Sequence, residues 1–364
     1  MMRRHTAALA IVTVALASWV SAPLAQDRAS GQAMTLDTAS GTLNGTLYLA
    51  SGRTPVVFVL AETGAAAIAA TLSAEGVAAL GYDTGSSPLD TRVDNAVAWI
   101  TKLRNDERFP TVTVLGFGST SSAAAAAAAR MARADALASI EPSPASAPNR
   151  GGPAPMWSAH LVVPVAIIKA SGDTITTKDA HTVAEHARKA PPLGRRGTSE
   201  ARPTSPRRSP RMTTVATIGG TRMAIEYGSP QKRGRTIWGA LVGYNGEWMP
   251  GADEATTLVT DVAIVLGTLA VPAGDHTLYA WPDRDRFQLI VSKDVGQFHT
   301  VYNPAQDLGR TDMTLTRLSS PVEGLTFAIE KIEPRGDAGV LKLIWDDREY
   351  SVPLTIAPRG GFDD

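Results

Sequence analysis

The chain of 364 residues lacks cysteine, an excess of either charge and any long apolar run. Without cysteine it forms no disulfide bonds and has neither a thiolate nucleophile nor a cysteine-based metal site. Lysine plus arginine and aspartate plus glutamate number 35 each, so no net field draws the protein to nucleic acid or to an acidic membrane. We therefore predict a fold held by core burial and no nucleic-acid partner.

The N-terminal residues have the order of a secretory signal peptide. Met-Met-Arg-Arg-His is followed by an apolar run over 7–20 and then by small residues up to Ala25. That run is shorter than the roughly 20 residues that span a bilayer as a helix. We predict a signal peptide over 1–25, a secreted or periplasmic protein and no transmembrane segment. Sec-type export is the default, and Arg3-Arg4 leaves a twin-arginine signal as the alternative.

Residues 26–190 alternate short apolar runs with helical stretches. Expected strands cover 42–49, 56–60, 77–82, 112–116 and 163–169, and expected helices cover 65–74, 90–104, 121–133 and 177–189. The run 56–60 is apolar throughout, which is typical of a strand covered on both faces. In 90–104 the apolar positions share one helical face, with Arg92 and Lys102 on the other side. The alternation predicts an α/β domain with a mostly parallel sheet and flanking helices.

Residues 112–120, Val-Thr-Val-Leu-Gly-Phe-Gly-Ser-Thr, resemble the nucleophile elbow of α/β-hydrolases, which normally reads Gly-x-Ser-x-Gly. Residues 61–64 are similar to the oxyanion loop of that family, and 82–87 to its next Asp-containing loop. Residues 165–173 are similar to the strand whose loop supplies the catalytic acid. The resemblance covers about 34–190 and implies an α/β-hydrolase-like fold.

The same stretch departs from the family where its chemistry should be. Gly118 occupies the serine position, and Thr120 replaces the glycine that lets the helix pack closely. We therefore predict a degenerate, non-catalytic domain. An alternative is an ester or peptide hydrolase that uses Ser119, with Asp173 as its acid.

The histidines do not suit that alternative. His181 and His186 follow Asp173 too closely to reach the elbow in the usual arrangement, and His160 precedes a strand. Asp173 also suits a turn before a helix, because Thr176-x-x-Asp179 resembles a capping box. A turn or cap role is the interpretation we favour for Asp173.

Residues 191–211 are dense in proline and arginine and have almost no apolar side chains. Such a segment buries too little to offset its ordering entropy, so we predict a solvated linker. Its six arginines also allow a salt-sensitive attraction to an anionic surface.

Residues 212–358 change to alternating strand patterns with frequent turns. The runs 213–218 and 221–227 flank Gly219-Gly220, which permits the positive φ angles of a two-residue hairpin turn. Further expected strands cover 259–266, 278–281, 287–291, 325–329 and 340–345. This pattern predicts an antiparallel β-sandwich or jelly roll, so the fold class of the whole chain is α/β plus all-β.

Three segments of this half carry a second resemblance: 225–230, Ile-Glu-Tyr-Gly-Ser-Pro; 232–239, Lys-Arg-Gly-Arg-Thr-Ile-Trp-Gly; and 248–257, Trp-Met-Pro-Gly-Ala-Asp-Glu-Ala-Thr-Thr. They are similar to the bacterial domain of unknown function 2911 (DUF2911), as are 269–274 and 293–298. The resemblance covers about 205–355 and implies a secreted or periplasmic β-domain without an established activity.

Aromatic residues gather in the second half, which contains four of the seven tryptophans. Flat aromatic faces beside polar groups suit sugar rings or extended peptides, although aromatics also fill β-cores. The candidate ligand-binding residues are Trp248, Asp253, Glu254, Tyr279 and Trp281. Trp248 precedes the two acids in a loop where strand packing alone does not call for a tryptophan. Adjacent acids on a strand point to opposite faces, which weakens an acid–base role for the pair.

Together the patterns predict an exported, non-catalytic protein that joins a degenerate hydrolase domain to a β-sandwich. The sandwich is expected to bind a glycan, a peptide or an envelope protein. We expect no cofactor and no metal. A purely structural envelope role is the third possibility, beside the hydrolase that uses Ser119.

Overall fold

The computed structural model describes residues 30–38, 40–142, 165–170, 175–190, 207–332 and 336–357. The expected signal peptide, His160, Asp173 and residues 191–206 of the expected linker lie outside these ranges. Among the described residues, no helix has the length and apolar character needed to cross a membrane.

The first half forms a seven-stranded sheet in the order β1-β2-β4-β3-β5-β6-β7. Strands β3 to β7 run parallel, and β1 and β2 are antiparallel additions at one edge. The strands are β1 (Gln32–Thr38), β2 (Gly41–Tyr48), β3 (Val56–Ala61), β4 (Ala78–Asp83), β5 (Val112–Phe117), β6 (Ala136–Pro142) and β7 (Val165–Ala170). The predicted α/β-hydrolase-like sheet is therefore confirmed, and β1 and β6 are the two strands that the sequence patterns missed.

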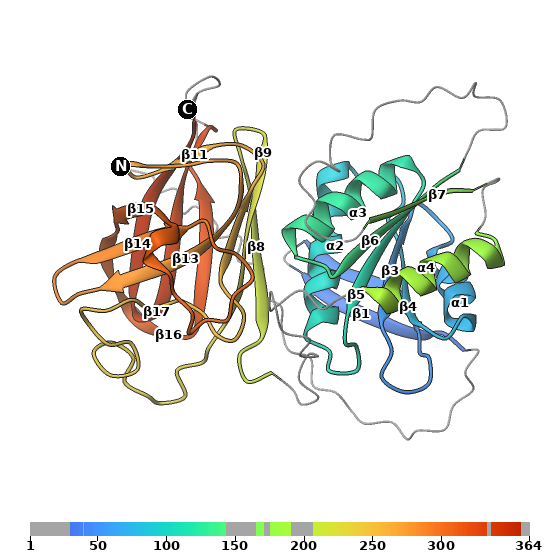
Figure 1. Cartoon of the computed structure of the whole chain (residues 1–364), viewed down its shortest axis with the longest axis horizontal. Coiled ribbons are helices and arrows are strands. Elements are labelled where there is room, and N and C mark those ends of the chain that lie inside the picture. Colours follow the sequence, from blue (N-terminus) through green and yellow to red (C-terminus); the bar gives the residue numbers. More distant parts are fainter. Residues whose placement is uncertain are drawn as a thin grey trace, which may run out of the picture.

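Four helices cover the two faces of this sheet: α1 (Ala65–Ala74), α2 (Leu89–Arg104), α3 (Ser119–Met131) and α4 (Thr177–Lys189). Helices α2 and α3 pack on one face, and α1 and α4 on the other (Figure 1). Every residue of β3 is buried, as its apolar run predicts. Gly116 in β5 permits the close approach of α3, because a Cβ there would lie 2.4 Å from the Cα of Ser122.

The second half forms an antiparallel sandwich, which confirms the second part of the predicted fold class. A six-stranded sheet, β15-β14-β13-β10-β9-β8, faces a four-stranded sheet, β12-β11-β17-β16. The strands are β8 (Arg211–Ile218), β9 (Thr221–Gly228), β10 (Thr257–Thr260), β11 (Ile264–Leu266), β12 (Leu269–Val271), β13 (Gly274–Pro282), β14 (Phe287–Ser292), β15 (Asp307–Asp312), β16 (Thr314–Lys331) and β17 (Ala338–Ile356).

Two sequence predictions in this half have opposite outcomes. The β8–β9 hairpin forms as expected, with Ile218 paired to Thr221 and with Gly219 and Gly220 at φ of 57° and 74°. The single strand expected over 259–266 is wrong, because β10 and β11 belong to different sheets. Alternating hydrophobicity does not reveal where a chain crosses from one sheet of a sandwich to the other.

The two halves pack against each other through α2 and α3, which lie between the seven-stranded and six-stranded sheets (Figure 1). Ala224 of β9 and Val259 of β10 belong to the same apolar cluster as these helices. The hydroxyls of Thr101 in α2 and Thr213 in β8 lie 3.0 Å apart. Helix α2 is therefore buried on both sides. The prediction that Arg92 faces outward is wrong, because its side chain is only 4% exposed and its Nε donates to the carbonyl oxygen of Ser87.

Candidate functional sites

The turn that resembles a nucleophile elbow joins β5 to α3 through Gly118. This residue has φ 85° and ψ 155°, a conformation open essentially to glycine alone, whereas Ser119 is the first residue of α3. The apex of the turn, with its glycine-only conformation, therefore lies at Gly118 and is not shifted by one residue. Ser119 is exposed at the start of the helix, beside the apex instead of on it.

The described histidines of the first half have partners elsewhere. His181 Nδ1 lies 3.0 Å from a carboxylate oxygen of Glu75, and His186 Nε2 lies 3.0 Å from the carbonyl oxygen of Leu137. Both belong to α4, where Thr176 and Asp179 form the predicted capping box. Because Asp173 lies outside the described residues, its role as an acid stays a prediction.

The acidic side chains near the elbow stabilise loops at the carboxyl ends of the strands. Asp83 accepts a hydrogen bond of 2.7 Å from the backbone N–H of Ala65 at the start of α1. Glu62 forms an ion pair of 2.9 Å with Arg92, whose Nε also donates to the carbonyl of Ser87. These contacts give both carboxylates structural partners at the edge where a hydrolase keeps its chemistry.

Trp248 is half-buried and packs against the sandwich core. Its backbone pairs with Ala280 of β13, and its ring stacks on Trp345 with 6.2 Å between centroids and an angle of 11°. Trp238 meets the same ring edge-on. The premise that strand packing does not call for a tryptophan here is wrong, because the loop before β10 pairs with β13. A ligand-binding role for Trp248 stays a prediction.

Tyr279 and Trp281 lie on the other face of β13, because side chains alternate along a strand. The Tyr279 ring is buried, its hydroxyl donates to the carbonyl of Val301, and Tyr302 packs edge-on against it at 4.8 Å. Trp281 is half-buried, with the Arg310 guanidinium 5.0 Å from its centroid. Of the two predicted residues, Trp281 is therefore the more accessible.

Asp253 and Glu254 meet an arginine from the end of the expected linker. Arg207 is 7% exposed and hydrogen-bonds both carboxylate oxygens of Glu254, at 2.5 and 2.8 Å. Asp253 has φ 63° and lies 3.4 Å from Arg207. Burial alone would raise the pKa of Glu254, but Arg211 and Arg207 outweigh burial and hold this pKa well below its usual range. The prediction of a fully solvated linker is wrong at Arg207 and Arg211.

The five predicted ligand-binding residues therefore occupy three separate places: the sandwich core, the outer face of the six-stranded sheet, and an ion-paired loop. Within the described ranges, no group of three or more histidine, aspartate or glutamate side chains is placed to hold a metal ion.

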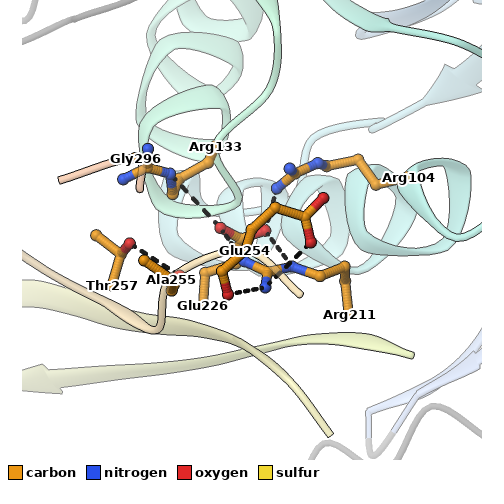
Figure 2. Close-up of a pocket in the computed structure, with 8 residues that line it drawn as sticks. All are labelled: Arg104, Arg133, Arg211, Glu226, Glu254, Ala255, Thr257 and Gly296. Atoms are coloured by element: carbon orange, nitrogen blue, oxygen red, sulfur yellow. Dashed lines mark hydrogen bonds and ion pairs between the residues drawn. The ribbon is translucent and has the colours of Figure 1, made fainter. Parts of the chain in front are cut away.

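The densest polar cluster lies between the two halves, around Glu226 of β9 (Figure 2). Arg211 of β8 contacts this carboxylate through Nη2 at 2.8 Å and Nε at 3.1 Å. Arg104 of α2 pairs with Oε1, and Arg133, just after α3, lies 3.5 Å from Oε2. The side chains of Glu226, Arg211 and Arg104 are only 2–3% exposed. We call these four residues the Glu226 cluster.

The charges of the cluster are strongly coupled. Burial alone would raise the pKa of Glu226, but the surrounding arginines, Arg104 and Arg211 first, hold it below its ordinary value. Burial lowers the pKa of Arg133. Further ion pairs extend the cluster: Arg211 with Glu254, Arg130 with Asp261 and Asp275, and Arg133 with Asp275. The arrangement suits tight docking of two layers better than proton transfer to a substrate.

The sequence patterns did not single out this cluster. Alternation places Glu226 on the strand face opposite Ile225 and Tyr227, which on a sandwich is usually solvated. The available signal was Ala224 and Val259, small apolar residues that share the outer face with Glu226. Apolar residues on an outward face indicate that another layer covers it.

A family model described as "Protein of unknown function (DUF2911)" matches residues 209–354, which confirms the resemblance of the second half of the chain. No curated protein matches the chain.

The solved structures similar to the chain include α/β-hydrolases at low identity. A serine hydrolase without a lid from Xanthomonas campestris has 16% identity and a TM-score of 0.31, with 46% of this chain and 96% of that one covered. A dienelactone hydrolase from Anabaena variabilis has 14% identity and a TM-score of 0.32, with 45% and 97% covered. A hypothetical protein from Pseudomonas aeruginosa has 20% identity and a TM-score of 0.28, with 32% of this chain covered. The match spans only 44% of that last protein.

Proposed function

We propose that the protein is exported and non-catalytic, with a degenerate α/β-hydrolase domain that supports a ligand-binding β-sandwich. The observation that carries the proposal is Gly118 at the apex of the elbow, the position where the family keeps its serine nucleophile. The ligand class is a glycan or an extended peptide of the envelope or the extracellular space.

The lack of catalysis is supported by the requirements of acyl transfer. The reaction needs a hydroxyl aimed at the carbonyl, a base that takes its proton and an acid that orients the base. Ser119 lies beside the apex, and both described histidines near this sheet have other partners. The rival function is an esterase or peptidase that uses Ser119.

A fluorophosphonate probe distinguishes these two functions. The purified full chain should show no covalent labelling above a heat-denatured control. Labelling that disappears in Ser119→Ala would reject the non-catalytic proposal and support the esterase.

Ligand binding is supported by the outer face of β13, β14 and β15. Helices α2 and α3 cover the β8–β9–β10 half of this sheet, whereas Trp281 and Tyr302 remain half-buried on the other half. Tyr302 donates to Asp307 at 2.7 Å and accepts from Arg310 at 3.1 Å. Rings fixed beside charged groups suit a sugar, whose apolar face stacks while its hydroxyls form hydrogen bonds.

The test is a thermal-shift screen of the full chain against soluble cell-wall fragments, chito-oligosaccharides and short peptides. A ligand that binds only the folded state raises the melting temperature. Trp281→Ala should abolish that rise with little change in the unliganded melting temperature. Trp248→Ala is the matched control: it should lower the unliganded melting temperature but leave the rise. A rise that survives Trp281→Ala would exclude this face, and no rise with any class would favour a structural envelope role.

Export is supported by the order of charged, apolar and small residues over 1–25. The mass of the mature protein recovered from the periplasm or medium should correspond to cleavage near Ala25. An uncleaved protein confined to the cytoplasm would reject export without affecting the ligand-binding proposal.

A further inference from the structure

Three exposed arginines gather on the second half of the chain. Arg208 lies just before β8, and Arg233 and Arg235 lie in the loop between β9 and β10. Arg233 Nη2 donates to the carbonyl oxygen of Arg208 at 2.8 Å. The N–H of Arg235 donates to the carbonyl oxygen of Lys232 at 3.0 Å, and this tight turn keeps Arg233 close to Arg235. We call Arg208, Arg233 and Arg235 the arginine patch.

The contacts of the arginine patch fix its side chains without neutralising them. Arg235 donates from Nε to the carbonyl oxygen of Lys232 at 3.0 Å and from Nη2 to that of Gln231 at 2.5 Å. Within the described ranges, none of the three guanidinium groups forms an ion pair. A carbonyl oxygen is neutral, so it orients an arginine and leaves the full positive charge. Side chains ordered in advance lose less entropy when they bind a partner.

The carboxylates that border the patch do not balance it. Asp346 forms an ion pair with Lys232, and Glu323 accepts a hydrogen bond of 2.6 Å from the backbone N–H of Arg233. With Lys232, the groups in contact carry four positive charges and two negative ones. The neighbouring Arg207 is buried against its own carboxylates. The chain as a whole has equal numbers of acidic and basic residues, so this excess of positive charge is local.

An exposed leucine belongs to the same loop. Leu241 is 47% exposed, and its N–H donates to the carbonyl oxygen of Thr236, the residue after Arg235, at 3.2 Å. Ile237 and Trp238 between them are buried and anchor the loop on the sandwich. A soluble polyanion gains from the arginines alone. A lipid surface also takes up an apolar side chain, because its headgroups cover an acyl layer.

We propose that the arginine patch and Leu241 dock the protein reversibly on an anionic phospholipid surface. The guanidinium groups bind lipid phosphates, for which their planar fork is well suited, and Leu241 enters the boundary between headgroups and acyl chains. This surface is separate from the residues around Trp281 that carry the ligand-binding proposal. Either proposal therefore stands if the other one fails.

The test is cosedimentation of the full chain with lipid vesicles at low salt. Vesicles of phosphatidylcholine alone should bind little protein, whereas vesicles that also contain phosphatidylglycerol should bind it. The bound fraction should fall as sodium chloride is added, because salt screens charges at a surface. The vesicles are pure lipid, so the result does not depend on export.

Two double variants with the same change in net charge locate the binding. Arg233→Gln with Arg235→Gln should weaken vesicle binding about 25-fold, since each arginine near an anionic surface contributes about fivefold. Arg286→Gln with Arg317→Gln is the matched control. It removes two exposed arginines that already pair with aspartates, so it should weaken binding by less than about fivefold.

A second pair of variants tests the apolar contact. Leu241→Ser should weaken vesicle binding by about fivefold, because a half-exposed leucine buries the rest of its apolar surface in the lipid. Val301→Ser is the control, since Val301 is 50% exposed but lies outside this loop, and it should leave vesicle binding unchanged.

Three results would overturn the proposal. The first is no binding of the unmodified chain to phosphatidylglycerol vesicles, a measurement that needs no variant. The second is an equal loss in the two double variants, which would assign binding to total charge instead of the arginine patch. The third is binding to soluble polygalacturonate at least as tight as to vesicles and unaffected by Leu241→Ser, which would make the partner an acidic glycan.

Discussion

The carboxyl edge of the parallel sheet and the joint between the two halves differ in how they use polar residues. At the edge, Gly118 and Ser119 lie in a turn without a described base, and the nearby acids stabilise loops. At the joint, Glu226 and its arginines are almost fully buried, with shifted pKa values. Shifted ionisation often marks a catalytic site, but structural ion networks shift pKa values too. In this protein, the shifted pKa values of Glu226, Arg211 and Arg133 accompany the packing of two layers.

The location of the buried charges has a physical consequence. Removing a carboxylate and several guanidinium groups from water costs on the order of several kcal/mol for each ion. Good geometry must offset that cost. The geometry around Glu226 is complete only when α2, α3 and the six-stranded sheet are all in place, because each contributes a partner. We therefore expect the two halves to unfold together.

Replacing Glu226 should have the largest effect. Glu226→Gln leaves Arg104 and Arg211 buried without their shared charge, so the free energy of unfolding should fall by about 3–5 kcal/mol. Urea denaturation followed by tryptophan fluorescence measures this loss. Glu330→Gln is the control, because Glu330 pairs with Lys342 within the sandwich and is 33% exposed. If both variants lose the same small amount of free energy of unfolding, the Glu226 cluster does not hold the two halves together.

The pH dependence of stability should report the same carboxylates. Glu226 and Glu254 have pKa values below the ordinary 4.5, so the unfolded chain binds protons at these groups before the folded one does. Their contribution is complete above about pH 5 and is lost as the pH falls below 4.5, by up to about 1.4 kcal/mol per pH unit for each carboxylate. Denaturation at pH 7, 5 and 3.5 measures the slope, and Glu226→Gln should make it shallower. If the slope of stability against pH does not change in Glu226→Gln, acid unfolding does not depend on the charges between the two halves.

Local patterns predicted most of the fold. The bounds of α1 and α4 and the glycine turn between β8 and β9 match the expectation, because caps, periodicity and turn chemistry act over a few residues. The joint was not predictable in this way. The partners of Glu226 come from positions 104, 133 and 211, and no local signal encodes that α2 packs between two sheets. Trp248 was misplaced for the same reason, since its ring packs against Trp345, almost one hundred positions along the chain.

A serine introduced at the elbow tests the carboxyl edge of the parallel sheet. Gly118→Ser restores the hydroxyl where the family has it, and a Cβ there meets no atom within 4 Å. The positive φ should still cost about 1–3 kcal/mol of stability. We expect the variant to fold but to stay unlabelled by a fluorophosphonate, because both described histidines of this half have other partners. Labelling of Gly118→Ser would mean that this edge keeps a working base and lacks only its nucleophile.

The smallest expected effect concerns the exposed part of the joint. Arg222 of β9 reaches Asp90 and Asp94 of α2, but these carboxylates are 78% and 59% exposed. Water and salt screen such pairs, so Arg222→Gln should lower the free energy of unfolding by at most about 1 kcal/mol. Denaturation at low and high salt measures this difference, which should shrink as salt rises. Both Arg222 and Arg104 form ion pairs between the sandwich and α2. A loss as large as that of Glu226→Gln would therefore show that bridging the layers, not burial, sets the strength of the joint.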